Sequence, residues 1–140
     1  MSELLVKRLS VEAILPTRTH ADDAGLDFYT LEDIILQPSE GRLVGTGVAI
    51  ALPAGHVGLI LDRSSFGQKG IKTAGGVIDA GYRGEIKIAL WNISSVAVWI
   101  SRGDRIAQLV ILPIVTPSVK EVHDLDDTSR GTTGFGASGK

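Results

Sequence analysis

Apolar and polar residues alternate along much of this chain with a period of two, the spacing of a β-strand with one buried face. The clearest case is the segment 85–92. One face of that strand would carry Ile86, Ile88 and Leu90, and the opposite face Lys87, Ala89 and Trp91. No segment has the apolar spacing of an amphipathic helix over three turns. The pattern therefore predicts a chain built almost entirely from strands.

Four further segments have the length of strands and are rich in Val, Ile and Leu. They are 44–52, 56–61, 96–100 and 104–112. Turn-forming residues separate them, at Pro53-Ala54-Gly55, Gly75-Gly76, Gly81, Ser94-Ser95 and Arg102-Gly103. One short helical turn is predicted over 63–69. Many short strands with regular turns predict a single all-β domain, a sandwich or jelly roll. Its core would be 1–115, and the polar segment 116–140 would form a C-terminal arm of the same domain.

The composition narrows the possible partners. The 140 residues carry a formal net charge of −2, so we expect no nonspecific binding of nucleic acid. The sequence has no cysteine, which excludes disulfides and thiolate metal sites, and its three histidines are too scattered for a zinc site. The longest apolar run, 106–114, is too short to span a bilayer and contains Gln108. We expect a soluble cytoplasmic protein with no membrane partner.

Polar residues cluster in two of the predicted turns. The segment 62–70 sets Arg63 beside Ser64 and Ser65, a combination that suits phosphate oxygens. An ordinary loop in which Ser64 caps the helical turn is an equally good interpretation. The segment 75–85 is predicted to form a tight hairpin with Asp79 and Tyr82 near its tip. The alternative for Asp79 is a solvated turn carboxylate, the commoner role of an Asp beside Gly.

Two polar side chains fall within apolar strands. Gln108 lies in the run 106–112, and burying its amide without a partner would cost roughly 1–3 kcal/mol, so we expect a partner or a ligand there. Asp27 lies between Leu26 and Phe28, which we expect to pack inward and to leave the carboxylate on the opposite face. A purely structural carboxylate is the alternative for Asp27.

The last eleven residues, 130–140, contain four glycines and little that a core would use. Ordering such a segment costs backbone entropy, so alone it should be mobile. Arg130 nevertheless offers a planar fork for phosphate oxygens, and Phe135 offers a ring for stacking on a base. A disordered tail is the alternative interpretation. The spacing of Arg, Phe and Ser favours a flap that closes over a phosphate-bearing aromatic ligand.

Five segments resemble, in order, the five motifs of the trimeric deoxyuridine triphosphatases (dUTPases). They are Ala24-Gly-Leu-Asp27, Arg63-Ser-Ser65, Gly76-Val-Ile-Asp-Ala-Gly-Tyr82, Gly103-Asp-Arg-Ile-Ala-Gln108 and Arg130-Gly-Thr-Thr-Gly-Phe-Gly136. The resemblance implies a jelly-roll homotrimer with three active sites, each assembled from all three chains. It also implies Mg²⁺-dependent hydrolysis of dUTP to dUMP and pyrophosphate, which limits uracil in DNA and supplies dUMP for thymidylate synthesis.

The same resemblance implies roles for particular residues. Asp79 would activate the water that attacks the α-phosphorus, Tyr82 would pack against the deoxyribose, and Asp27 would reach Mg²⁺ through metal-bound water. The main chain of 76–79 would read the uracil edge, while the flap would stack on uracil and close over the phosphates. The remaining substrate-binding residues would be Arg63, Ser64, Ser65, Thr73, Gly76, Val77, Ile78, Lys87, Gln108, Arg130, Phe135, Gly136 and Ser138.

The chain departs from the family pattern in a few positions. Phe28 stands where Leu is common, and Thr73 stands where many bacterial members carry an Asn that contacts uracil. Two other functions compete with dUTP hydrolysis. The sister family of dCTP deaminases needs a glutamate base at the position of Ala89, and alanine cannot transfer a proton. A noncatalytic, nucleotide-sensing trimer would have no need of Asp79.

Overall fold

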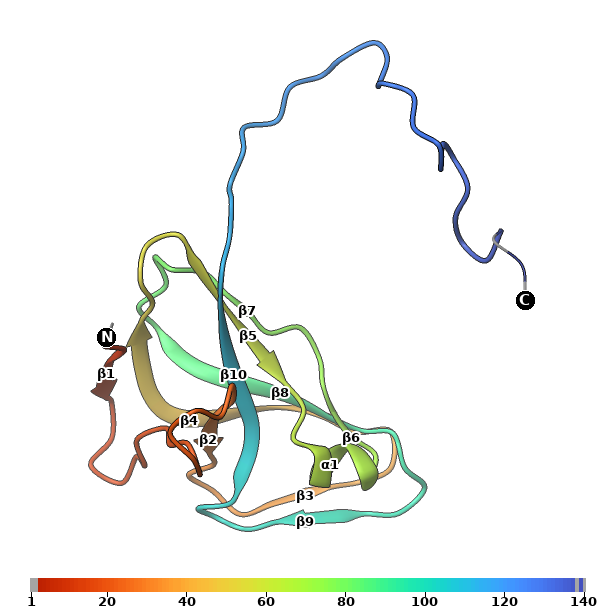
Figure 1. Ribbon diagram of the computed structural model, residues 1–140. Helices are drawn as coiled ribbons and strands as arrows, with labels where there is room; N and C mark the ends of the chain where they lie inside the picture. The colour runs from red at the N-terminus through yellow and green to blue at the C-terminus, as the bar shows by residue number, and fades with distance from the viewer. Residues whose placement is uncertain (1–2, 138, 140) are drawn as a thin grey trace.

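Figure 1 shows the computed structural model of the chain, which describes residues 3–137 and 139. Within these residues the chain forms ten strands and one short helix, and no helix is long and apolar enough to cross a membrane. The elements are β1 (Leu5–Arg8), β2 (Leu26–Tyr29), β3 (Ile34–Leu36), β4 (Gly41–Ala51), β5 (His56–Leu61), α1 (Ser64–Gln68), β6 (Ile71–Thr73), β7 (Val77–Ile78), β8 (Glu85–Asn92), β9 (Val98–Ile100) and β10 (Arg105–Pro113). The all-β prediction is confirmed.

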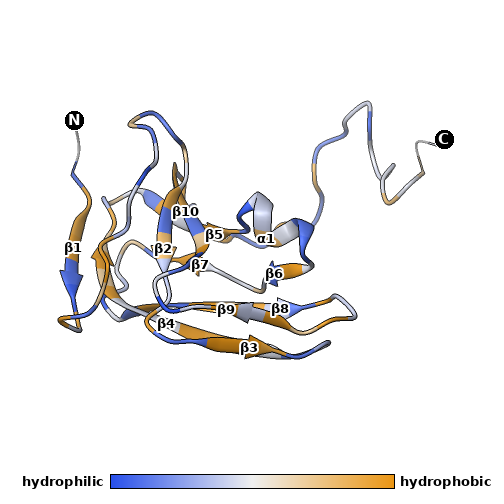
Figure 2. Cartoon of the chain, turned by 90° about the horizontal axis from the view of Figure 1, so that it is seen from below, coloured by the Kyte–Doolittle hydropathy of each residue, from blue (hydrophilic) through white to orange (hydrophobic). Residues whose placement is uncertain are grey.

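The strands pair antiparallel in three sheets. One four-stranded sheet has the order β1-β4-β8-β6, the second has the order β2-β10-β5-β7, and β3 pairs with β9. In Figure 2 the second sheet lies above β4 and β8, and buried apolar residues of both sheets form one core cluster. The short helix α1 follows β5 directly and occupies the predicted helical turn, with Arg63 and Lys69 as its flanking residues.

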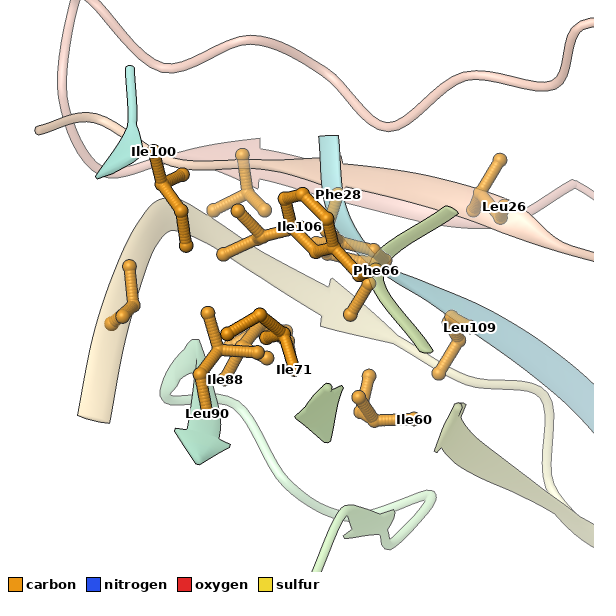
Figure 3. Packing of buried hydrophobic residues seen from close by; sticks show 14 of the residues in the cluster. Leu26, Phe28, Ile60, Phe66, Ile71, Ile88, Leu90, Ile100, Ile106 and Leu109 are labelled. Atoms are coloured by element: carbon orange, nitrogen blue, oxygen red, sulfur yellow. The ribbon is translucent and has the colours of Figure 1, made fainter. Parts of the chain in front are cut away.

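The core lies between these layers and follows the predicted alternation. In β8, Ile86, Ile88 and Leu90 are fully buried while Lys87 and Trp91 are exposed. Figure 3 shows how the buried side chains of β8 meet those of the other sheet, among them Phe28 from β2. Each such buried side chain contributes roughly 1.5–3 kcal/mol through removal of apolar surface from water. The faces that carry polar groups therefore point outward, where a site can form.

Two details of the strand prediction are wrong. Val96 lies outside β9 and is exposed, because its carbonyl oxygen closes a turn by accepting hydrogen bonds from Asn92 Nδ2 at 2.8 Å and Ser94 Oγ at 3.0 Å. The segment 75–85 is no β-hairpin. β7 pairs with β5 and β8 pairs with β4 and β6, so the two arms belong to different sheets.

Gly76 explains that second difference. Its φ of +110° favours glycine, and a Cβ at this position would lie 2.7 Å from Cβ of Ile60. The Gly76 carbonyl accepts a hydrogen bond from the Ile60 amide at 2.8 Å, which draws this segment onto β5. The predicted tight turn itself is present, since the Tyr82 amide donates to the Asp79 carbonyl at 3.0 Å.

The segment after β10 leaves the body of the molecule as an extended arm (Figure 1). Its last hydrogen bond to the body runs from the Ile114 amide to the Gly55 carbonyl at 2.9 Å. Beyond that point the described residues are exposed almost throughout, and apolar side chains such as Val119 and Phe135 are fully exposed. In the single chain the described part of the arm therefore packs against no other element.

Candidate active site

A pocket of about 250 Å³ lies beside the turn that follows β7. Five of the residues that line it belong to the predicted substrate site: Val77, Ile78, Asp79, Tyr82 and Lys87. The structure thus brings together residues from β7, from the turn and from the outer face of β8. The pocket walls are mainly apolar, with one carboxylate and one ammonium group among the predicted residues, a combination typical of small-molecule sites.

Asp79 has the environment of an available base. It is exposed, and no hydrogen bond or ion pair within the described residues engages its side-chain carboxylate. Its main chain is held by the β-turn from Asp79 to Tyr82. The carboxylate is therefore fixed at the pocket wall by its backbone while both oxygens stay available to a water molecule.

A second cluster lies on the outer face of the sheet β2-β10-β5. The register places Asp27, Gln108 and Leu61 side by side on three adjacent strands. Asp27 is confirmed on the face opposite Leu26 and Phe28, which are buried. The hydrogen-bond partner expected for Gln108 is the main chain of Asp62, directly after β5, because Gln108 Nε2 donates to the Asp62 carbonyl at 2.8 Å.

Asp27 joins two arginines. Its Oδ1 lies 3.4 Å from Nε of Arg63, and its Oδ2 lies 3.3 Å from Nη1 of Arg105. Arg63 also donates through Nη1 to the Arg105 carbonyl at 3.1 Å. Only 14% of the Asp27 side chain is exposed, so the carboxylate fixes both guanidinium groups in a partly desolvated setting.

The two predicted serines continue this cluster. Ser64 and Ser65 open α1 immediately after Arg63, and both are exposed. The alternative in which Ser64 caps the helix is wrong, because Arg63 occupies the N-cap position in an extended conformation and no side chain caps the helix. Arg63, the two hydroxyls and Gln108 thus line one surface at the end of β5.

The pocket and the arginine cluster lie at opposite ends of β5. Ile78 pairs with Gly58, so Asp79 lies level with Val57, six residues before Arg63. At 3.2–3.4 Å per residue, this separation is about 20 Å along the strand. A nucleophilic water must lie within about 3–3.5 Å of the phosphorus that it attacks. Within one chain, the Asp79 and Arg63 backbones are therefore too far apart for both side chains to surround the same phosphorus atom.

The remaining predicted residues are spread over the molecule. Thr73 ends β6 and its amide donates to Oδ1 of Asp62 at 2.6 Å, while Lys72 forms an ion pair with the same carboxylate. Gly76 directly precedes Val77 and Ile78, which line the pocket. Arg130, Phe135 and Gly136 lie in the arm, away from both clusters, and Ser138 lies outside the described residues.

The sequence analysis did not identify several residues of the pocket and of the arginine cluster. Leu43 and Glu85 line the pocket, while Asp62 and Arg105 organise the second cluster. Arg105 carried a usable signal, since it is a charged residue in an apolar strand and lies within the segment 103–108. The others depend on pairing between distant strands, which periodicity does not reveal.

The described residues contain no group of three or more His, Cys, Asp or Glu side chains that could hold a metal ion. Both oxygens of Asp27 already face arginines. Residues 3–137 and 139 of one chain therefore offer no inner coordination shell for a metal ion. These residues fit Mg²⁺ only in the arrangement where the ion keeps its waters and takes its direct ligands from phosphates, with Asp27 in contact with a metal-bound water.

Comparisons with known proteins agree on one family. The sequence model described as dUTPase matches residues 11–139. The deoxyuridine 5'-triphosphate nucleotidohydrolase of Rhodococcus erythropolis is 49% identical over 140 residues, covering 97% of this chain and 85% of the relative. That of Clostridium kluyveri is 45% identical and covers 98% of both chains.

Solved structures give the same answer. A mutant of the Staphylococcus bacteriophage 80alpha dUTPase with dUpNHpp has a TM-score of 0.94 and 34% identity, with full coverage of both chains. A mutant dUTPase of S. aureus phage phi11, described as coordinating a structural Mg(II) ion, has a TM-score of 0.84 and 33% identity over 90% of this chain and all of the other. The jelly-roll prediction is confirmed, and the chain belongs to the dUTPase family.

Proposed function

We propose that this protein hydrolyses dUTP to dUMP and pyrophosphate, with Asp79 as the general base. The observation that carries the proposal is the free carboxylate of Asp79 at the wall of a pocket that also contains Tyr82 and Lys87. A module that only bound nucleotide would need no such base. Membership of a family whose named members are dUTP nucleotidohydrolases gives the substrate.

In the proposed reaction, Asp79 accepts a proton from a water molecule as the water oxygen bonds to the α-phosphorus. The bond between the α-phosphorus and the oxygen bridging to the β-phosphate breaks, and pyrophosphate leaves with the bond electrons. Arg63, the hydroxyls of Ser64 and Ser65, and Gln108 hold the phosphate oxygens. The Asp27 carboxylate keeps Arg63 oriented before substrate arrives, so little reorganisation is needed during the reaction.

Base and sugar are read in the pocket. The main chain of 76–79 hydrogen-bonds the uracil edge. Thr73, three residues before this segment, is a further residue of the proposed substrate site. Tyr82 packs against the deoxyribose where a 2′-hydroxyl would otherwise lie. A hydroxyl forced into that space would lose its water partners without gaining others, which disfavours UTP. Lys87 supplies a positive charge at the pocket wall, and its side chain is half exposed.

We further propose that the protein is a homotrimer whose active sites are shared between chains. The separation of about 20 Å between Asp79 and Arg63 supports this, because a nucleotide in the pocket of one chain needs its phosphates held by another chain. The exposed arm, residues 116–140 of the same domain, then reaches a site on a neighbour. There Phe135 stacks on uracil while Arg130, Gly136 and Ser138 close over the substrate.

We also propose that Mg²⁺ is the cofactor. When bound, it neutralises much of the charge of the triphosphate. Asp27 is the residue that would contact it, through a metal-bound water on the side of the carboxylate not taken by Arg63 and Arg105. The structural Mg(II) ion of the phage phi11 relative is compatible with the choice of metal.

Deamination of dCTP is disfavoured by the environment of Ala89. This residue lies on β8 opposite Leu43, and its carbonyl accepts a hydrogen bond from the Ala74 amide at 3.0 Å. A methyl group in this position supplies no acid or base.

The test is to incubate the purified protein with Mg²⁺ and each deoxynucleoside triphosphate in turn, and to resolve the products. We expect dUMP and pyrophosphate from dUTP, and no reaction with dCTP or dTTP. A deoxyuridine nucleotide formed from dCTP would overturn the proposal, and so would a failure to cleave dUTP.

A further inference from the structure

We infer that Gly84 and the main-chain carbonyl of Glu85 lock the ring of Tyr82 in its pocket, and that this lock sets the selectivity for deoxyribose over ribose. The inference rests on the proposed function and deepens it. Sugar selection then depends on residues that never touch the sugar, because they decide where the tyrosine ring can lie.

The ring of Tyr82 lies directly against the backbone of Gly84. A Cβ added to Gly84 would lie closest to the hydroxyl oxygen of Tyr82, 2.6 Å from Cζ and 3.0 Å from Cε2. Real Cβ atoms do not approach a ring that closely, so any larger residue at position 84 must push the ring away. The backbone φ of Gly84 is not in the left-handed region, so glycine is required here for space rather than for conformation.

The hydroxyl of Tyr82 provides the second half of the lock. It donates a hydrogen bond to the Glu85 carbonyl at 2.9 Å. The Gly84 backbone and the Glu85 carbonyl thus both contact the hydroxyl end of the ring, which leaves that end little freedom to move. Tyr82 is nevertheless 45% exposed, and it lines the pocket together with Asp79 and Lys87.

The carbonyl that holds the hydroxyl belongs to a fixed element. Glu85 is the first residue of β8 and pairs with Ala49 of β4. Its own carboxylate accepts a hydrogen bond from the Gly47 amide at 2.9 Å, at the irregularity in β4 between Gly45 and Ala49. The Tyr82 hydroxyl is therefore bonded to a carbonyl whose position is fixed by the pairing of β4 with β8.

A fixed Tyr82 ring discriminates between deoxyribose and ribose better than a mobile ring would. A ring that could swing aside would make room for a 2′-hydroxyl, and UTP would then bind in a reactive pose. A displacement of about 1 Å in a positioning group can change a rate about 100-fold. Loss of the lock should therefore reduce kcat/KM for dUTP and, more diagnostically, narrow the ratio of kcat/KM between dUTP and UTP.

The test compares Gly84→Ala with Gly81→Ala. The two glycines lie in the same connection between β7 and β8, neither has a φ in the left-handed region, and a Cβ at Gly81 would meet nothing within 4 Å. We expect Gly84→Ala to narrow the dUTP/UTP ratio at least about tenfold, the effect of a single misplaced contact of ordinary strength. Gly81→Ala should keep the ratio of the unmodified protein.

A third variant separates the hydroxyl from the ring. Tyr82→Phe keeps the ring on Gly84 and removes only the hydrogen bond to Glu85, so we expect a smaller narrowing of the ratio. It also serves if Gly84→Ala does not fold. An unchanged ratio in Tyr82→Phe would overturn the role of the carbonyl, and a folded Gly84→Ala with the ratio of Gly81→Ala would overturn the role of Gly84. The proposed function fails separately, if the unmodified protein does not hydrolyse dUTP.

Discussion

The carboxylate of Asp27 holds two arginines, and Asp27→Asn tests how much that arrangement contributes. The substitution keeps the shape of the side chain and removes its charge. Arg63 and Arg105 then face each other across a neutral amide, with their side chains only 23% and 41% exposed. Arg105 then loses a charge-assisted hydrogen bond, Arg63 loses an ion pair, and the two guanidinium groups repel each other.

The magnitude follows from the burial of the three side chains. Ion pairs between exposed groups contribute less than about 1 kcal/mol, whereas breaking a fully buried pair costs about 3–5 kcal/mol. Asp27 is 14% exposed, and its partners are more accessible, so the cost should be intermediate. We expect a loss of about 2 kcal/mol in the free energy of unfolding. For a chain of this size that corresponds to a fall of about 6 °C in Tm at fixed protein concentration.

Thermal unfolding of Asp27→Asn beside Asp22→Asn measures this effect. Asp22 is exposed in the preceding turn, so its substitution removes the same charge without breaking an ion pair. A Tm of Asp27→Asn within a degree of that of Asp22→Asn would refute the reasoning. A Mg²⁺ titration of dUTP hydrolysis tests the second role of Asp27, which predicts a weaker dependence on Mg²⁺ in Asp27→Asn alone.

Two further predictions concern catalysis. Asp79→Asn cannot accept a proton from water, so kcat should fall about 10²–10⁴-fold while dUTP still binds; a kcat within a few-fold of the unmodified value would mean that another group activates the water. Deletion of residues 130–140 should leave Tm unchanged, because the arm buries no surface against its own body, yet should sharply lower kcat/KM for dUTP. Phe135→Ala should do part of the same damage, since stacking on a base contributes about 1–3 kcal/mol. An undiminished kcat/KM for dUTP after the deletion would mean that residues 130–140 take no part in hydrolysis.

The strands that could be predicted from sequence are those with one buried face and enough length to show alternation. β5 and β8 have the predicted bounds of 56–61 and 85–92. β3, β6 and β7 have only two or three residues each, too few to show a period. The hairpin interpretation of 75–85 failed because Gly76 draws its arm onto β5, and no local pattern in the sequence records that long-range contact.

The site residues also divide into those that are close in sequence and those that only the fold brings together. Tyr82 and Asp79 are close in sequence, and the turn that joins them places both at the wall of one pocket. The ion pairs of Asp27 with Arg63 and Arg105 depend on residues from β2, β10 and the end of β5, so only the fold brings them together. The described flap residues contact neither cluster of their own chain, so their proposed role depends on a neighbouring chain, which sequence patterns cannot reveal.

Subunit complementation tests the central claim of shared active sites most directly. Asp79→Asn and Arg63→Ala should each be nearly inactive alone. Mixed in equal amounts and allowed to exchange subunits, they should regain dUTP hydrolysis in about one quarter of the sites, those that receive an intact Asp79 from one chain and an intact Arg63 from another. The double variant mixed with unmodified protein is the control and should give about one quarter of full activity, against about one half if each site lay within a single chain. Recovery of activity in the mixed single variants is the predicted result, and a mixture that stays as inactive as its components would contradict the account.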